Sequence, residues 1–208
     1  LLDRLGMPVV TVGNRQPGWP SVRIDDGAAM ALATEYAIEL GHREIGYAGT
    51  VPASITHLQT PFDRRAAFTT VMAANGLACP PEWTLECDWT AAGAAVHALE
   101  LFDRDHYPTC VIAASDEMGF GVLSAARRRG LDVPGDVSVI GFDDSEIAGS
   151  PGLELTTVRQ EPQQMSRLAV DRLIMRTSGE PVDAREIVLE PELVVRATTA
   201  PARLTRRS

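Results

Sequence analysis

The sequence has few cysteines, no long apolar run and fewer basic than acidic residues, and each deficit excludes a class of protein. The three cysteines, Cys79, Cys87 and Cys110, are odd in number and form no C-x-x-C pair, which argues against a disulfide framework. Free thiols favour a reducing compartment, so we expect the protein to work in the cytoplasm. No apolar stretch approaches the length of a membrane span, and the opening LLDRLGMPVV lacks the pattern of a signal peptide.

The charge balance bears on the choice of partner. There are 19 basic residues against 28 acidic ones, a formal net charge of −9, so the chain repels phosphate backbones. A nucleic-acid partner would therefore need another segment. The four histidines have no metal-ligand spacing, and no Gly-x-Ser-x-Gly or phosphate-loop pattern occurs. We predict that the chain is not an enzyme and that it holds no metal or cofactor.

What is present is an alternation of short apolar strands with helices. Strands are expected at 8–13, 22–24, 44–49, 83–87, 109–114, 136–142 and 155–159, and helices at 28–40, 62–75, 90–104, 116–129 and 162–177. A last extended piece, 186–195, is broken at Pro191. Strands that alternate with helices of these lengths predict parallel, right-handed βαβ crossovers and a doubly wound α/β sheet.

Polar and aromatic residues follow three of these strands directly. They are Asp88 with Trp89, Ser115 with Asp116, and Asp143 with Asp144. The carboxyl ends of parallel strands form the edge of a sheet where ligands bind. Carboxylates that accept hydroxyl hydrogen bonds beside a flat aromatic ring suit a sugar or another polyol.

Simpler roles compete for the same residues. Asp116 and Thr90 are good helix caps, and for Asp116 we favour the cap; for Asp143, cap and ligand contact are equally balanced on the residues alone. Trp89 could simply cover the sheet edge. Arg64 and Arg65 lie in the first turn of a predicted helix, where positive charge is unfavourable because it opposes the helix dipole. One of them is therefore a candidate for binding a partner. The alternative is that both are solvated surface residues.

Six segments of the chain stand in a characteristic order. They are GMPVVTVGNR, VRIDDGAAMALATEYAIELGHREIGYAGT, RRAAF, CVIAASDEMGFGVLSAARRRGLDVPGDVSVIGFDDSEIA, LTTVRQEPQQMSRLAV and ELVVRATT. Together they resemble the effector-binding core of lactose-repressor-type (LacI/GalR) bacterial transcription regulators, across nearly the full length of the chain. The blocks ELGHREIGYAG, SDEM to FDD, and LTTVRQ are specific in combination.

The resemblance implies a fold like that of periplasmic sugar-binding proteins, with two Rossmann-like lobes and a ligand cleft between them. It also implies roles for the residues of the cleft. The effector-binding set is Arg64, Trp89, Ser115, Asp143 and Gln160, with Trp89 as the stacking aromatic and Asp144 as a structural neighbour. Gly13, Ala67 and Ser115 depart from the usual residues of the family, and these departures bear on the identity of the sugar more than on the site.

Matching to the family also predicts how the chain divides. Residues 24–160 and 191–200 would form a complete second lobe, 1–23 and 161–190 a remnant of the amino-terminal lobe, and 201–208 a tail. Members of the family begin with a DNA-binding headpiece that has no counterpart here, so the chain is expected to be amino-terminally truncated.

These features predict the ligand-binding and dimerisation domain of a sugar-responsive DNA-binding repressor. A homodimer would use Phe120 and Ile147, for which ordinary core packing is the alternative, and operator DNA would be read only by the absent headpiece. Two other functions stay open. One is a solute-binding component of a transport system, and the other is a metal-dependent hydrolase or phosphotransfer domain that uses Asp116, Asp143 and Asp144.

Overall fold

The computed structural model describes residues 7–16, 18–50, 59–178 and 186–203. Parts of all three predicted segments lie outside these ranges: 1–6, 17 and 179–185 of the first-lobe remnant, 51–58 of the second lobe and 204–208 of the tail. None of the described helices is long and apolar enough to cross a membrane.

The main element is a six-stranded sheet in the order β4-β3-β5-β6-β7-β9. Its strands are β3 (Ile45–Gly49), β4 (Thr84–Glu86), β5 (Cys110–Ala113), β6 (Ser138–Asp143), β7 (Thr156–Arg159) and β9 (Glu192–Val194). All neighbours are parallel except β9, which runs antiparallel to β7. The central strands are short β-branched and small-residue runs because both faces of a parallel sheet are covered. The predicted alternation is confirmed in this part of the chain.

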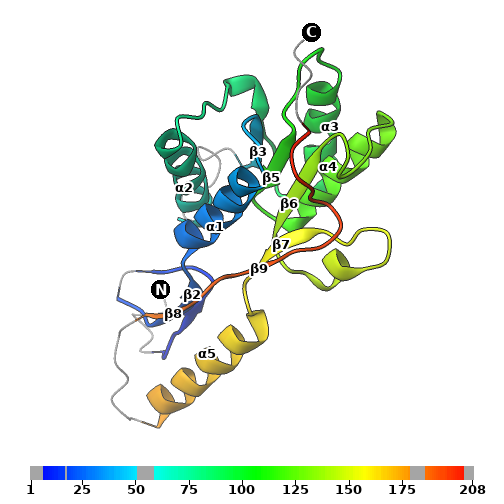
Figure 1. Cartoon of the computed structure of the whole chain (residues 1–208). Coiled ribbons are helices and arrows are strands. Elements are labelled where there is room, and N and C mark those ends of the chain that lie inside the picture. The colour runs from blue at the N-terminus through cyan, green and yellow to red at the C-terminus, as the bar shows by residue number, and fades with distance from the viewer. Residues whose placement is uncertain (1–6, 17, 51–58, 179–185, 204–208) are drawn as a thin grey trace.

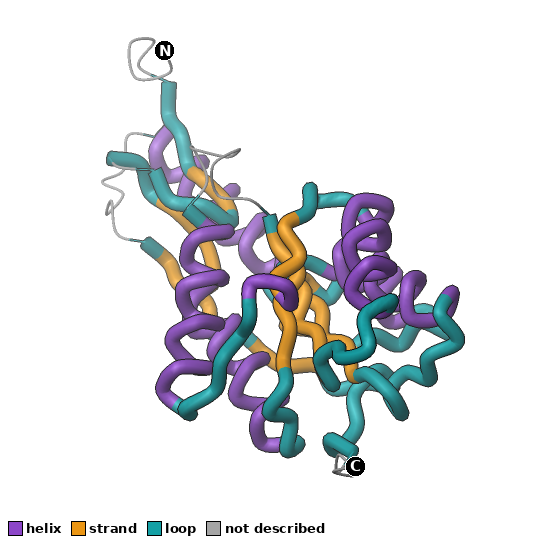
Figure 2. Tube along the Cα trace, turned by 90° about the horizontal axis from the view of Figure 1, so that it is seen from above, coloured by secondary structure: helices purple, strands orange, loops and turns teal. Residues whose placement is uncertain are grey.

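Helices cover both faces of the large sheet. On one face α1 (Asp26–Glu39) packs beside α2 (Thr60–Ala74), and on the other α3 (Ala91–Phe102) packs beside α4 (Asp116–Arg128). Figure 2 shows the strands between these two helical layers. Close approach of α3 and α4 depends on Gly121, because a Cβ there would lie 2.3 Å from the carbonyl oxygen of Ala91.

A second, smaller sheet has the order β1-β2-β8 and is entirely parallel. It consists of β1 (Thr11–Val12), β2 (Ser21–Ile24) and β8 (Ile187–Leu189), and α5 (Pro162–Thr177) packs against it (Figure 1). The predicted strand 8–13 is too long, since only Thr11 and Val12 pair with β2. The helix predicted at 162–177 has these same bounds in the structure.

The chain passes between the two sheets at three places. They are the junctions β2 to α1, β7 to α5, and β8 to β9. At the second junction Glu161 has a positive φ of 56°, a backbone conformation that non-glycine residues rarely adopt. The boundaries of the two lobes stay a prediction.

Candidate functional site

The predicted effector residues lie at one edge of the large sheet. Trp89 follows β4, Ser115 follows β5, Asp143 ends β6 and Gln160 follows β7. Because these four strands are parallel, their carboxyl ends meet at the same edge. The junction from β7 to α5 begins at this edge, so the candidate site borders a passage between the two sheets.

Arg64 reaches this edge from the start of the second turn of α2, and the residue is 4% exposed. Its Nε lies 2.8 Å and its Nη2 2.7 Å from Asp26 Oδ1, while Nη1 donates to the carbonyl oxygen of Ala114. The guanidinium also covers the ring of Phe142, with 3.5 Å between Cζ and the ring centroid. Arg64 is therefore a fixed, buried group and not a solvated arginine.

Asp26 is the site residue that the sequence analysis missed. It lies in the first turn of α1 and is 5% exposed, whereas its neighbour Asp25 caps the helix by accepting from the amide of Ala28 at 3.0 Å. Burial raises the pKa of Asp26, and the adjacent Arg64 opposes that rise by favouring the carboxylate. The doublet Asp25-Asp26 thus contains one cap and one counter-ion.

Asp143 is the accessible acid of the site, with a side chain 36% exposed. Its Oδ1 lies 3.9 Å from Arg64 Nη1 and accepts a hydrogen bond from the amide of Gln160. Burial, opposed by Arg64 and assisted by the nearby Asp116 carboxylate, raises the pKa of Asp143 to about 6. The structure thus brings Arg64, Asp143 and Gln160 together, as the family resemblance implied.

Asp144 has a different task from its neighbour. Its carboxylate lies 2.7 Å from Arg159 Nε and also pairs with Arg196, and Arg159 extends the network to Glu192 at 2.8 Å. These arginines lower the pKa of Asp144 by pairing with its carboxylate, against the opposing effect of burial. Asp144 therefore ties β6 to β7 and to the segment after β9, in agreement with the predicted structural role.

The cap of α4 was assigned to the wrong residue. Ser115, not Asp116, is the N-cap, and its hydroxyl accepts from the amide of Met118 at 3.2 Å. Asp116 is 1% exposed and instead accepts from Ser145 and Thr157. In the described part of the chain this hydroxyl only accepts a hydrogen bond, and its role in binding an effector stays a prediction.

Trp89 is half-buried against the hydrophobic core, beside the start of α3. In the described part of the chain it makes no ring contact or hydrogen bond with Arg64, Asp143 or Gln160. The preceding Asp88 accepts hydrogen bonds from the hydroxyl of Thr90 at 2.6 Å and from its amide at 3.0 Å, and these two bonds lower the pKa of Asp88. Stacking of an effector on Trp89 stays a prediction.

The two candidate dimer residues differ in exposure. Ile147, in the short helix η4 (Glu146–Gly149), is 55% exposed, whereas Phe120 on α4 is half-buried and packs against the core. Ile147 is therefore free to meet another surface. Contact of either residue with a second copy stays a prediction.

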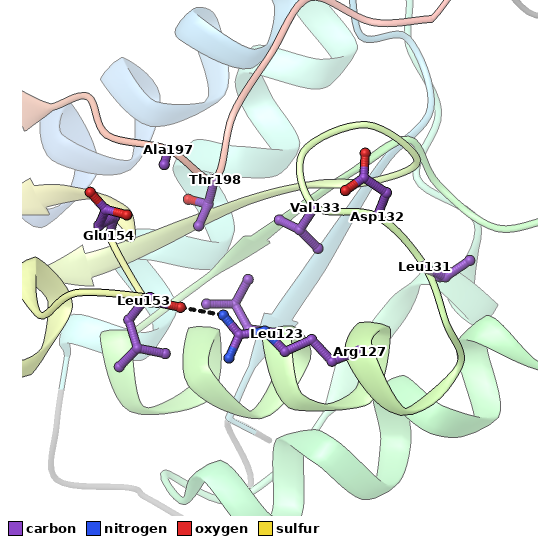
Figure 3. Close-up of a pocket in the computed structure, with 10 residues that line it drawn as sticks. Leu123, Arg127, Leu131, Asp132, Val133, Leu153, Glu154, Ala197 and Thr198 are labelled. Atoms are coloured by element: carbon purple, nitrogen blue, oxygen red, sulfur yellow. Dashed lines mark hydrogen bonds between the residues drawn. The ribbon is translucent and has the colours of Figure 1, made fainter.

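The three acids proposed for metal chemistry have different hydrogen-bond and ion-pair partners. Asp116 and Asp144 are engaged by separate partners, and the described residues contain no group of three His, Cys, Asp or Glu side chains that could hold a metal ion. A separate cavity of about 280 Å³ lies at the opposite edge of the sheet, before β6 and β7. Figure 3 shows Leu123 and Arg127 of α4 on one side of it and Thr198 on the other, so this cavity is distinct from the candidate site.

Comparison with known proteins shows which family the chain resembles. Residues 34–199 match the family model described as a periplasmic binding protein-like domain. The HTH-type transcriptional regulator MalR of Streptomyces coelicolor is 39% identical over 202 residues, which are 95% of this chain and 57% of that protein. The chain thus spans a little over half the length of this curated relative.

Two solved structures have the same fold. The LacI transcriptional regulator from a Rhodococcus species is 34% identical, with a TM-score of 0.83 that covers 97% of this chain and 75% of that one. The transcriptional regulator CelR in its cellobiose complex is 31% identical, with a TM-score of 0.84. The match covers 95% of this chain and 60% of that one. These relatives are regulators, which favours regulation over transport. Because the domain model covers most of the chain and these regulators share its fold, the chain belongs to the periplasmic binding protein-like domain family, in the form found in LacI-type transcriptional regulators.

Proposed function

We propose that the chain binds an uncharged sugar at Arg64, Asp143 and Gln160 and is the effector-binding part of a sugar-responsive DNA-binding regulator. One observation carries the proposal. A buried guanidinium and an accessible carboxylate lie 3.9 Å apart at the carboxyl ends of parallel strands. A hydroxyl group between them could accept from Arg64 and donate to Asp143, which is the two-sided hydrogen bonding that a sugar hydroxyl offers.

The charges around the site favour a neutral effector. Asp26 already balances Arg64, so Asp143 gives the group a net negative charge when it is ionised. A phosphate or carboxylate on the effector would meet repulsion from Asp143 and would compete with Asp26 for the guanidinium. The relative CelR is known in complex with cellobiose, an uncharged disaccharide, which supports the same class of ligand here.

The regulatory part of the proposal follows from the position of the site. An effector that binds two arrangements of the sheets with different affinity would shift the balance between them. In a cytoplasmic homodimer with contacts at Phe120 and Ile147, such a shift would alter the spacing of two DNA-reading segments. Those segments would lie outside this chain, because a net charge of −9 disfavours direct contact with DNA.

Replacement of Asp143 by alanine should weaken sugar binding about 10-fold to 100-fold, since hydrogen bonds to a charged acceptor would be lost. Isothermal titration calorimetry with a panel of neutral sugars that includes cellobiose measures this. Asp105→Ala, which removes an exposed acid from the loop after α3, is the matched control and should bind as the wild type does. Equal affinities for Asp143→Ala and wild type would contradict the assignment.

Sugar affinity should also depend on pH through Asp143. Hydroxyl donors prefer the carboxylate, and the pKa of this group is raised to about 6. Affinity should therefore be constant above pH 7 and should fall as the pH drops below 6, approaching about tenfold per pH unit. Asp143→Asn should bind more weakly and show no such fall. A wild-type affinity that stays constant from pH 7 to pH 5 would show that the charge of Asp143 does not contribute.

A further inference from the structure

We infer that Asp116 is a positioning residue for Asp143: it fixes the turn after β6 so that the Asp143 carboxylate faces Arg64. This inference rests on the proposed function for its biological meaning, but its geometry stands independently. The feature concerned is the segment from Asp143 to Ser145, which connects β6 to η4.

This segment has an unusual backbone. Asp143 has a φ of 132° and Asp144 a φ of 53°, so two successive non-glycine residues lie in a region that favours glycine. Such a backbone conformation is strained and persists only where surrounding contacts hold it. The segment therefore requires fixed partners.

Asp116 supplies these partners from the start of α4. Its Oδ2 accepts from both the amide and the hydroxyl of Ser145, at 2.7 Å and 2.8 Å. Its Oδ1 accepts a hydrogen bond from the hydroxyl of Thr157 at 2.5 Å. The same hydroxyl accepts a hydrogen bond from the backbone amide of Asp144 at 3.4 Å. One buried carboxylate thus holds the backbone at Ser145 directly and at Asp144 through Thr157.

The sequence leaves room for this carboxylate. A Cβ at position 141 would lie 2.4 Å from Asp116 Oδ1, so the glycine in VIGFDD allows Asp116 to approach the strand. Asp116 is itself held at the first position of α4, next to the Ser115 cap. The start of α4 is thereby connected, through Asp116, to the turn that carries Asp143.

The surroundings of Asp143 agree with this geometry. The charged groups that face it are Arg64 from α2 and Asp116 from α4, and Gln160 donates from the end of β7. The carboxylate of Asp116 raises the pKa of Asp143, while its backbone amide favours the ionised form. A change at Asp116 should therefore be detectable at Asp143 without any ligand.

The test uses Asp116→Asn in the ligand-free protein, with the titration of the Asp143 carboxyl carbon followed by NMR. We expect the pKa of Asp143 to fall from about 6 toward the ordinary aspartate range, and the Ser145 amide to exchange its hydrogen about tenfold faster. Because loss of the Asp116 charge alone lowers the pKa of Asp143, the exchange at Ser145 decides the positioning role, and unchanged exchange there would overturn the inference. A variant that is merely less stable would speed amide exchange throughout the fold and not selectively at Ser145.

A second pair of variants covers the case in which Asp116→Asn does not fold. Thr157→Val removes the hydroxyl at nearly constant shape, and Thr157→Ser keeps it. Only the valine variant should speed amide exchange at Asp144, again by about tenfold, and weaken cellobiose binding in calorimetry by a similar factor. Equal exchange in the two variants would contradict the inference. If the wild type binds no sugar of the panel, the proposed function fails, while the ligand-free measurements still decide the role of Asp116.

Discussion

Replacing Arg64 by methionine should lower the free energy of unfolding by about 3–5 kcal/mol, because Asp26 would be left as a buried carboxylate without a counter-ion. Both side chains of this pair are almost fully buried, at 5% and 7% exposure. Burial already raises the pKa of Asp26 and Arg64 counteracts it, so removal of Arg64 would raise this pKa further. The loss should therefore grow as the pH rises and shrink as Asp26 takes up a proton. Urea unfolding at several pH values measures it.

The next residue provides a matched control. Arg65 lies beside Arg64 in α2 and also forms an ion pair, but its partner is Glu86 and the pair is solvated, with side chains 36% and 48% exposed. Arg65→Met should cost less than about 1 kcal/mol. The double variant Arg64→Met with Asp26→Asn should recover much of the loss, since no buried charge remains. Similar costs for Arg64→Met and Arg65→Met would mean that the buried pair does not stabilise the fold.

The arrangement of strands and helices was predictable because local signals agree with long-range packing. The helix at 162–177 begins with Pro162 in its first turn, a position where proline costs nothing, and its bounds are those predicted. The run CVIA reads as a strand because all four residues are fully buried in a parallel sheet. In both cases the pattern within ten or fifteen residues determines the element.

The contacts of acidic residues could not be read in the same way. An aspartate near the start of a helix satisfies the capping pattern whether it caps or not, and both Asp26 and Asp116 lie at such positions. Their partners, Arg64 and Thr157, are 38 and 41 residues away. Which aspartate caps and which is buried with a distant partner depends on the tertiary fold. The family resemblance indicated Arg64 and Asp143 but not the acid that balances Arg64.

Phe142→Ala should destabilise the protein by about 3–5 kcal/mol, comparable to the loss of Arg64. The ring is fully buried in β6, one residue before Asp143, and Arg64 lies 3.5 Å above its centre. Truncation would leave a cavity in the core and remove the aromatic face that supports the guanidinium. Chemical denaturation measures the change in the free energy of unfolding.

Phe142→Leu separates these two effects. Leucine refills much of the cavity but offers no aromatic face, so its cost should be about 1 kcal/mol if packing dominates. A cost close to that of alanine would instead assign most of the stabilisation to the contact between the ring and Arg64. In that case Arg64→Met in the Phe142→Leu background should cost less than it does in the wild type, because the two residues share one interaction. Additive losses would show that Phe142 supports the sheet independently of the effector site.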